Sequence, residues 1–421
     1  MTATVTLTLV RGRLDPGSYV FDERTTCLLG RAEDCSPRLP DDEHHNTVSR
    51  HHCLLDINPP QVRVRDFGSL NGTYVNGAKI GQREQGMSAR EAAALRFPEH
   101  DLRDGDEIRL GETVFRVDVH APDPVADGDP DGDPDVKARL LLDLAHAGER
   151  DLAPLAGYEL LRLLGRGGMG AVYLAHDPRT GRQVALKLML PKAAARAEAR
   201  LRFLQEAAFG ATLRHPNIAA LHDYGYADGA FFFSLEYCPG GSLDELLRQR
   251  GGRLPAHEAV PLIVQALNGL AHAHAATVVH RDLSPHNILL ADVPKIADFG
   301  LAKSFDQNGL SGLTRTGAAA GKPLFMPRQQ VVMFKNATPA VDVWAMAATL
   351  YHCLTGAYPR DFSPAKDVWQ TVLQSPAVPI RQRDPSIPRP LAEVIDRALT
   401  ERPAIGFQTA AEFRQALLSA F

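Results

Sequence analysis

The sequence HRDLSPHNILL at residues 280–290, followed by DFG at residues 298–300, decides how the second half of the chain is interpreted. Apolar stretches flank it at residues 260–279 and 341–354. Both are interrupted by Gln, Asn, His or Asp, so we expect buried helices rather than membrane spans. From Tyr158 onward, strand-like segments precede helical ones. This order predicts an α+β region with a small sheet-rich lobe and a larger helical lobe.

Upstream of this run, three glycines form the pattern GxGxxG at Gly165, Gly167 and Gly170. Because glycine lacks a Cβ, the backbone amides of such a turn approach phosphate groups closely. The pattern alone also fits a dinucleotide-binding turn or a plain hairpin. The next strands favour a nucleotide site, because Lys187 at the end of VALK can reach phosphates held under the glycines.

A lysine that faces phosphates needs an anionic partner to hold it. We expect Lys187 to pair with Glu206, which lies on the helix predicted after the strand. Each residue alone is equally compatible with solvated surface charge. Their combination with the motifs downstream favours the pair.

With HRD, Asn287 and DFG following in this order, residues 158–421 resemble the protein kinase family. The resemblance implies an enzyme that uses ATP and Mg2+ to phosphorylate Ser and Thr hydroxyls of proteins. It implies that Asp282 accepts or orients the proton of the substrate hydroxyl. It also implies that Asn287 and Asp298 hold magnesium against the ATP phosphates.

The same resemblance locates the adenine site. The backbone of the hinge SLEYCPGGSL, from Glu236 to Cys238, would meet the base, and Leu235 would guard the pocket behind it. Three apolar side chains would sandwich the base: Val172, Ala185 and Leu289. Ordinary core packing is the alternative role of these three residues, and both roles are compatible.

Two departures from the family pattern concern the catalytic charge. Ser284 stands two residues after Asp282, where serine/threonine kinases have a lysine, and the family's Gly-Thr segment is Gly321-Lys322 here. Because the two family positions are neighbours in space, we hypothesise that Lys322 replaces the missing ammonium. The alternative is two independent losses.

Another pair of departures concerns an ion pair. The family's Ala-Pro-Glu is Pro327-Arg328-Gln329, and the arginine partner of that glutamate falls at Gly406. Removing one buried partner costs about 3 to 5 kcal/mol, whereas losing both is nearly neutral in many cases. We therefore expect an intact fold. Asp342 matches the aspartate that supports the catalytic loop in the family.

The segment LTRTGAAAGKP resembles the double-threonine activation loop of bacterial kinases. The resemblance implies phosphorylation at Thr314 and Thr316. A phosphothreonine there would pair with nearby arginines, Arg281 among them, and order the loop. The alternative is that these threonines are only solvated loop hydroxyls.

The N-terminal part, from Thr2 to about Val119, consists of short alternating runs separated by Gly, Asn and Asp, which predicts an all-β module. A helix-like insertion is expected at about residues 82–101. Three motifs resemble a forkhead-associated (FHA) domain: LGR at 29–31, VSRHH at 48–52 and DFGSLNGTYVNG at 66–77. The resemblance implies a β-sandwich that binds phosphothreonine.

By that resemblance, four residues form the phosphothreonine site: Arg31 and Ser49 on the phosphate, Arg50 beside it, and Asn71 on the peptide backbone. Arginine forks match phosphate geometry, and loops on a rigid scaffold position them. Leu70 replaces a hydroxyl that some members use, so we expect modest affinity. Two further residues, His52 and Asn76, are expected to brace the loops. A purely structural role of these loops is the alternative.

Bulk properties agree with a globular protein of 421 residues in two or three domains. The net charge of -4 favours neither a nucleic-acid nor a membrane partner. Five cysteines without a CxxC pair indicate neither disulfides nor zinc, and the N-terminus lacks a signal-peptide pattern. A cytoplasmic protein is expected.

We therefore predict a multidomain chain: a β-sandwich at residues 1–120, an acidic Pro/Gly/Asp linker with a short helix at 121–157, and a kinase domain at 158–421, with lobes at about 158–235 and 239–421. The expected function is an autophosphorylating kinase that docks phosphopeptides. The alternative is a pseudokinase adaptor that binds nucleotide. Expected partners are protein substrates and phosphothreonine-containing proteins or its own activation loop, with transient self-association.

Overall fold

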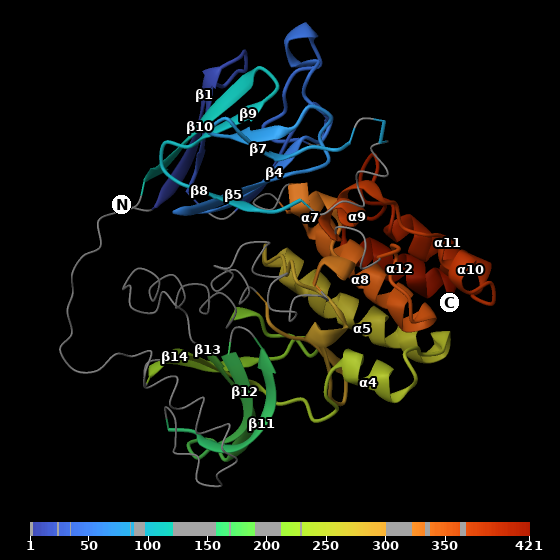
Figure 1. The fold of residues 1–421 in the computed structure, drawn as a ribbon. Helices are drawn as coiled ribbons and strands as arrows, with labels where there is room; N and C mark the ends of the chain where they lie inside the picture. Colours follow the sequence, from blue (N-terminus) through green and yellow to red (C-terminus); the bar gives the residue numbers. More distant parts are fainter. Residues whose placement is uncertain are drawn as a thin grey trace, which may run out of the picture.

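A β-sandwich, a five-stranded sheet and a group of helices make up the described part of the chain (Figure 1). The computed structural model describes residues 3–22, 25–33, 35–84, 86–87, 97–120, 157–167, 170–189, 212–227, 230–299, 322–332, 337–362 and 368–421. Several predicted features lie outside these residues: nearly all of the linker, Glu206, and the phosphosites Thr314 and Thr316.

The sandwich confirms the all-β prediction. A six-stranded sheet in the order β2-β1-β10-β9-β6-β7 faces a four-stranded sheet in the order β3-β4-β5-β8. In β1, Val5 and Leu7 are fully buried and alternate with threonines, as the period of two requires. The strands are β1 (Thr4–Arg11), β2 (Ser18–Phe21), β3 (Thr25–Leu29), β4 (Cys53–Asn58), β5 (Gln61–Asp66), β6 (Thr73–Val75), β7 (Ala78–Gly81), β8 (His100–Leu102), β9 (Glu107–Leu110) and β10 (Thr113–His120).

The last two residues of the predicted helix-like insertion, His100 and Asp101, lie in a strand instead. They belong to β8, which pairs antiparallel with β5. Leu102 is buried in the sandwich core, and this burial favours the strand. Residues 88–96 lie outside the described part of the chain.

The second sheet is antiparallel, with the order β11-β12-β13-β15-β14. Its strands are β11 (Glu159–Gly167), β12 (Gly170–Asp177), β13 (Arg182–Met189), β14 (Leu221–Ala227) and β15 (Ala230–Glu236). They correspond to the predicted small lobe. One face buries a compact apolar cluster around Tyr158, Tyr173 and Leu186.

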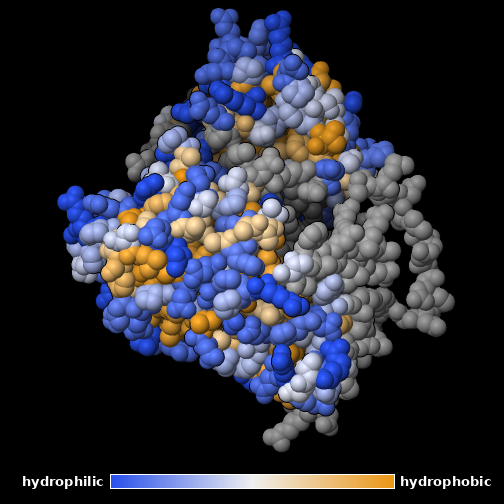
Figure 2. All heavy atoms as spheres, turned by 180° about the vertical axis from the view of Figure 1, so that it is seen from behind, coloured by the Kyte–Doolittle hydropathy of each residue, from blue (hydrophilic) through white to orange (hydrophobic). Residues whose placement is uncertain are grey.

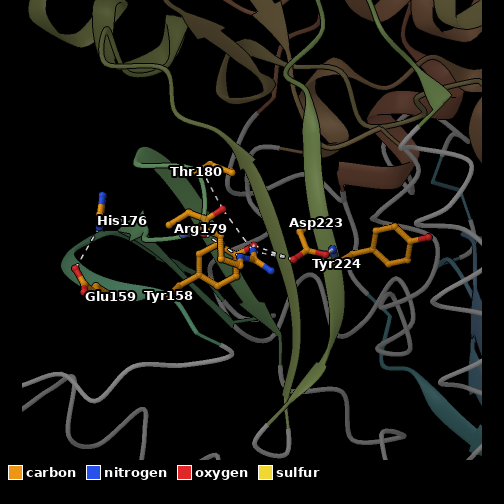
Figure 3. Close-up of polar contacts among 8 residues, drawn as sticks. Tyr158, Glu159, His176, Arg179, Thr180, Asp223 and Tyr224 are labelled. Carbon is orange, nitrogen blue, oxygen red and sulfur yellow. Dashed lines mark hydrogen bonds and ion pairs between the residues drawn. The ribbon is translucent and has the colours of Figure 1, made fainter.

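A polar network fixes the point where the chain enters this sheet (Figure 3). Arg179, in the turn between β12 and β13, pairs with Asp177 at 2.9 Å and with Asp223 of β14 at 3.0 Å. Its guanidinium lies 4.8 Å from the ring centroid of Tyr158, whose hydroxyl donates to Asp223 at 3.0 Å. Three separate segments are thereby tied together at one end of the sheet.

The helical lobe is built around α8 (Pro339–Thr355), which is buried along most of its length. Gly356 caps its C-terminal end with a φ of 70°, the left-handed conformation that glycine adopts at helix ends. The remaining elements are α4 (Leu243–Gln249), α5 (Ala256–Ala275), η2 (Pro285–Asn287), β16 (Ile288–Leu290), β17 (Pro294–Ile296), η3 (Lys322–Phe325), α7 (Arg328–Val332), α8 (Pro339–Thr355), α9 (Val368–Gln374), α10 (Ile380–Arg383), α11 (Arg389–Ala398) and α12 (Ala410–Ala420).

Helices α5 and α8 confirm the predicted buried helices. Among the described residues, no helix is both long and apolar enough to cross a bilayer. The helical lobe lies between the sandwich and the five-stranded sheet (Figure 1), and β3 of the sandwich contacts α7. Seen from behind, the sandwich shows mainly hydrophilic residues, and larger hydrophobic patches lie over the helical lobe (Figure 2).

Candidate functional site

One face of strands β12 and β13 is apolar and buried, and the other carries the residues predicted to meet the nucleotide. The buried face consists of Ala171, Tyr173, Ala175, Val184, Leu186 and Leu188. Their neighbours Val172, Ala185 and Lys187 are only half-buried, because strand side chains alternate between faces. Val172 and Lys187 are partners in the register. Leu289 of β16 is half-buried as well.

The glycine pattern forms the end of the β11–β12 hairpin. Gly167 pairs with Gly170, and Gly165 pairs with Val172. A Cβ built on Gly165 would meet no atom within 4 Å, so the space around it is open. The hairpin end therefore lies in register with the strand that carries Lys187.

Lys187 reaches across to the DFG segment. Its Nζ donates to Asp298 Oδ2 at 2.6 Å, with the two side chains 18% and 28% exposed. The predicted partner, Glu206, lies outside the described residues. Asp298 has a φ of 63°, which costs a non-glycine residue about 1 to 3 kcal/mol and is typical of functional positions.

A buried carboxylate holds the loop that contains Asp282. Asp342 of α8 is 1% exposed and accepts the backbone N–H groups of His280 at 2.7 Å and Arg281 at 2.8 Å. His274 donates to the same carboxylate at 2.9 Å. Arg281 has a φ of 65°, so this strained turn is fixed by two charge-assisted hydrogen bonds. The expected support by Asp342 is confirmed.

His280 joins the two loops of the site. Its Nδ1 accepts the N–H of Asp282 at 3.2 Å, so the proton resides on Nε2, which donates to the carbonyl of Ala297 at 2.8 Å. Ala297 directly precedes Asp298. His280 therefore fixes the distance between the HRD and DFG segments, a role that the sequence analysis did not assign to it.

Asn287 lies beside Asp282. Its amide nitrogen donates to the carbonyl oxygen of Asp282 at 2.6 Å, which leaves Asn287 Oδ1 as the acceptor oxygen of that side chain. Together with the Asp298 carboxylate it provides hard oxygen ligands of the kind that Mg2+ prefers, with phosphates completing the shell. These residues fit a magnesium ion.

The hinge is fixed by a lysine that the sequence analysis missed. Lys295 of β17 pairs with the Glu236 carboxylate at 3.2 Å, and the other carboxylate oxygen accepts the N–H of Ala220 at 3.2 Å. Cys238 is buried, and burial raises the pKa of its thiol to about 11. The hinge thiol is therefore neutral at physiological pH. No sequence motif marks Lys295.

The lost ion pair of the family pattern has a local counterpart. Glu401 accepts the backbone N–H of Arg328 at 2.6 Å, and its carbonyl oxygen accepts the side-chain amide of Gln329 at 2.6 Å. The buried guanidinium of Arg360 pairs with Glu401 at 2.6 Å. Burial raises the pKa of Glu401, and Arg360 offsets part of that rise. Segment 328–332 is thus tied to residue 401.

Gly406, where the family has its arginine, has no room for a side chain. A Cβ there would lie 1.9 Å from the carbonyl oxygen of Arg397. The family's ion pair is therefore excluded sterically at this position. The other substituted position, Ser284, is half-buried next to η2, and Lys322 begins η3.

The predicted phosphothreonine residues lie together on the loops of the sandwich. Ser49 Oγ accepts the backbone N–H of Leu70 at 2.9 Å, which joins two of these loops. Arg31 donates from Nε to the carbonyl of Val48 at 2.7 Å and pairs with Asp41. The other two predicted residues, Arg50 and Asn71, are exposed on the same loops.

The expected bracing residues are confirmed. Buried His52 joins Ser49 N–H and Gly72 carbonyl through its two ring nitrogens, and Asn76 bonds to Asp106 and Glu107. Asp66 was missed by the sequence analysis. It is 2% exposed and accepts hydrogen bonds from the residues that shape the loop after β5: Gly68, Ser69 and Thr73.

His51 lies where these loops approach the helical lobe. Burial, together with the positive charges of Arg50 and Arg402, lowers its pKa to about 4. An unfolded histidine has a pKa near 6.5. Between these values the unfolded chain binds more protons than the folded one, so acid destabilises the fold.

We predict that lowering the pH from 7 to 5 reduces the free energy of unfolding less in His51→Gln than in the natural protein, by up to about 2 kcal/mol. Glutamine keeps a polar side chain but does not titrate. Urea unfolding at both pH values measures the difference. Equal losses in the two proteins would contradict a neutral, half-buried His51 in the folded state.

Family models agree with the geometry. The protein kinase domain model matches residues 158–406, and the FHA domain model matches residues 27–111. The solved kinase domain of Mycobacterium tuberculosis PknI has a TM-score of 0.51 at 29% identity, and the match covers 64% of this chain and all of that domain.

Curated relatives are bacterial serine/threonine-protein kinases. PknD of Mycobacterium tuberculosis is 39% identical over 258 residues, which are 61% of this chain and 38% of PknD. PknF of the same organism is 37% identical, over 62% of this chain and 56% of PknF. PrkC of Bacillus subtilis is 32% identical, over 63% of this chain and 40% of PrkC. The match thus spans between 38% and 56% of these relatives.

Proposed function

The chain belongs to the protein kinase family, and from this premise we propose that it transfers the ATP γ-phosphate to Ser and Thr hydroxyls of proteins. The observation that supports this most strongly is the polar cluster of the site. Lys187 pairs with Asp298, His280 joins the two loops, and Asn287 bonds to the backbone of Asp282. Lys187, Asp282, Asn287 and Asp298 are of the types that phosphoryl transfer requires, and His280 links the segments that carry Asp282 and Asp298.

Each residue has a defined part in the proposed reaction. Asp282 orients the acceptor hydroxyl and takes its proton as the oxygen attacks the γ-phosphorus. Lys187 would hold the phosphates of ATP, and Asn287 and Asp298 would hold Mg2+, which would offset negative charge on the phosphates. The bond to the β-phosphate breaks, and ADP leaves. Catalysis therefore rests on position and charge.

We also propose that the kinase phosphorylates its own activation segment at Thr314 or Thr316. The FHA domain would then bind phosphothreonine on partner proteins, or on this segment, through the Arg31 and Ser49 loops. A tether between two modules raises their effective mutual concentration to about the millimolar range, so even weak self-docking would matter.

A second candidate is a pseudokinase adaptor that binds nucleotide and recruits phosphoproteins. The observation that favours it is Ser284, which provides no cation beside Asp282. The retained cluster of Lys187, Asp298 and Asn287 favours the kinase.

Incubation with Mg2+ and ATP should place phosphate on Thr314 or Thr316 of the natural protein but not of Asp282→Asn. Loss of the proton acceptor reduces general-base catalysis on the order of a hundredfold or more. Phosphosite mapping by mass spectrometry measures both. Intact ATP binding without phosphate in the natural protein would favour the adaptor.

Lys322→Ala should reduce the rate of phosphoryl transfer on the order of tenfold or more, because Lys322 would supply the charge that Ser284 does not. Initial rates at saturating ATP measure the effect. Asp282→Asn, which lacks the proposed proton acceptor, gives the background rate. An unchanged rate in Lys322→Ala, with an abolished rate in Asp282→Asn, would reject the replacement.

Arg31→Ala should weaken binding of a phosphothreonine peptide on the order of tenfold or more, because a guanidinium–phosphate contact is charge-assisted. Arg116→Ala is the matched control, since Arg116 also pairs with an aspartate, Asp118, but lies on the other sheet. Fluorescence anisotropy measures both affinities. Equal affinities of the two variants would exclude Arg31 from the site.

A further inference from the structure

One row of residues on the outward face of the four-stranded sheet is buried. In the register, Cys27, Leu55 and Val64 form a row that faces the sandwich core. The next row, on the opposite face, consists of Leu28, Leu54 and Arg65, which are 2%, 3% and 6% exposed. Antiparallel sheets of a lone sandwich usually show polar residues on this face. Strands β3 and β4 are therefore buried on both faces.

The helical lobe of the kinase domain covers this face. One apolar cluster joins residues of both domains: Leu28, Ala32, Cys35, Leu54 and Phe67 of the FHA domain with Val331, Trp369, Val372 and Leu373 of the kinase domain. Partly buried Met326 and Phe362 pack against it. Strand β3 contacts α7 directly.

Helix α9 fits a position between two domains. It has seven residues, and five successive ones, from Trp369 to Leu373, are buried. A surface helix buries a single stripe, whereas a helix buried on all sides lies inside a core. One side of α9 contacts its own lobe near η3, and the FHA domain covers another.

Charged and titratable side chains lie beside this shared apolar cluster. The Arg65 guanidinium lies 5.6 Å from the ring centroid of Phe67, so its apolar stem and planar head cover the cluster. His51 of the FHA domain lies within the electrostatic influence of Arg402 of the helical lobe. Polar side chains of both domains thus surround the apolar centre of the interface, as is usual for protein interfaces.

Helix α7 connects the interface to the catalytic loop. It has only five residues, too few to be stable without tertiary contacts. Val331 packs in the shared cluster, while its neighbour Gln330, 3% exposed, donates to the carbonyl of Arg281 at 2.6 Å. Arg281 directly precedes Asp282. At the start of α7, Arg328 is hydrogen-bonded to Glu401 of the helical lobe. Near its end, Val331 packs against the FHA domain.

We propose that the FHA domain is a fixed intramolecular partner of the helical lobe, docked through the β3–β4–β5 face onto α7 and α9, and that this docking positions the catalytic loop. The phosphothreonine loops border the interface at Ala32 and His51, but their tips stay outside it, where Leu70 is 45% exposed and Arg50 and Asn71 are exposed as well. The docked domain therefore keeps its ligand site open. The part that concerns catalysis rests on the proposed kinase function.

The test is Leu54→Glu in the full chain, with Val20→Glu as the matched control. Leu54 points away from the sandwich core into the interface, whereas Val20 is 64% exposed on the other sheet. The chain has two tryptophans, and Trp344 is fully buried within the helical lobe, so a change in emission reports Trp369.

Leu54→Glu should shift the tryptophan emission to the red, increase the radius of gyration in solution scattering, and lower kcat at least fivefold with an unchanged KM for ATP. Val20→Glu and the conservative Leu54→Met should behave as the natural protein does. Phosphothreonine-peptide affinity should persist in all variants, which shows that the sandwich is folded.

Unchanged emission and radius of gyration in Leu54→Glu would overturn the docking. An opened protein with unchanged kcat would overturn its role in positioning the catalytic loop. If Leu54→Glu does not fold, Val372→Glu in α9 tests the same interface from the kinase side and must give the same opening. Tryptophan emission and the radius of gyration measure docking independently of catalysis. An inactive natural protein would therefore reject the proposed kinase activity but not the docking.

Discussion

The catalytic half of this protein depends on one buried carboxylate. Asp342 lies in α8, which is buried along most of its length, and accepts two consecutive backbone N–H groups of the HRD segment. A turn with Arg281 at positive φ is unfavourable by itself, so these hydrogen bonds select it. His280 then extends the fixed geometry to the DFG segment through Ala297. The HRD and DFG segments are thereby held in a fixed arrangement relative to each other.

The segment 328–332 shows how a departure from the family pattern is accommodated. Gln329 and Gly406 remove both halves of a buried ion pair, yet the segment is held by Glu401, whose charge is balanced by Arg360. Arg360 also donates to the carbonyls of Met326 and Ser375, so its buried donors are used. A buried charge is tolerated when it is paired and fully hydrogen-bonded. A different ion pair, Glu401 with Arg360, thus holds segment 328–332 in place of the family's pair.

The two domains are joined by more than the chain between them. Leu28 and Leu54 would be exposed apolar residues on an isolated sandwich, and Trp369 would be exposed on an isolated helical lobe. Docking removes both apolar surfaces from water, and the free energy gained is proportional to the apolar area buried. The runs TTCLL and CLLDIN already lack the apolar–polar alternation of a one-sided strand, and this is the trace of the interface in the sequence.

The sequence by itself determined the two domain types, the HRD and DFG loops, the glycine hairpin and the phosphothreonine loops, because ordered motifs with fixed spacing impose local geometry. The tertiary structure decided what distant residues do. It paired Lys187 with Asp298, assigned Lys295 to the hinge and Glu401 to Arg360, and replaced the end of the expected insertion by β8. The reason is physical: such pairs join residues far apart in the chain, and their partners are selected by burial and packing, which no local pattern records.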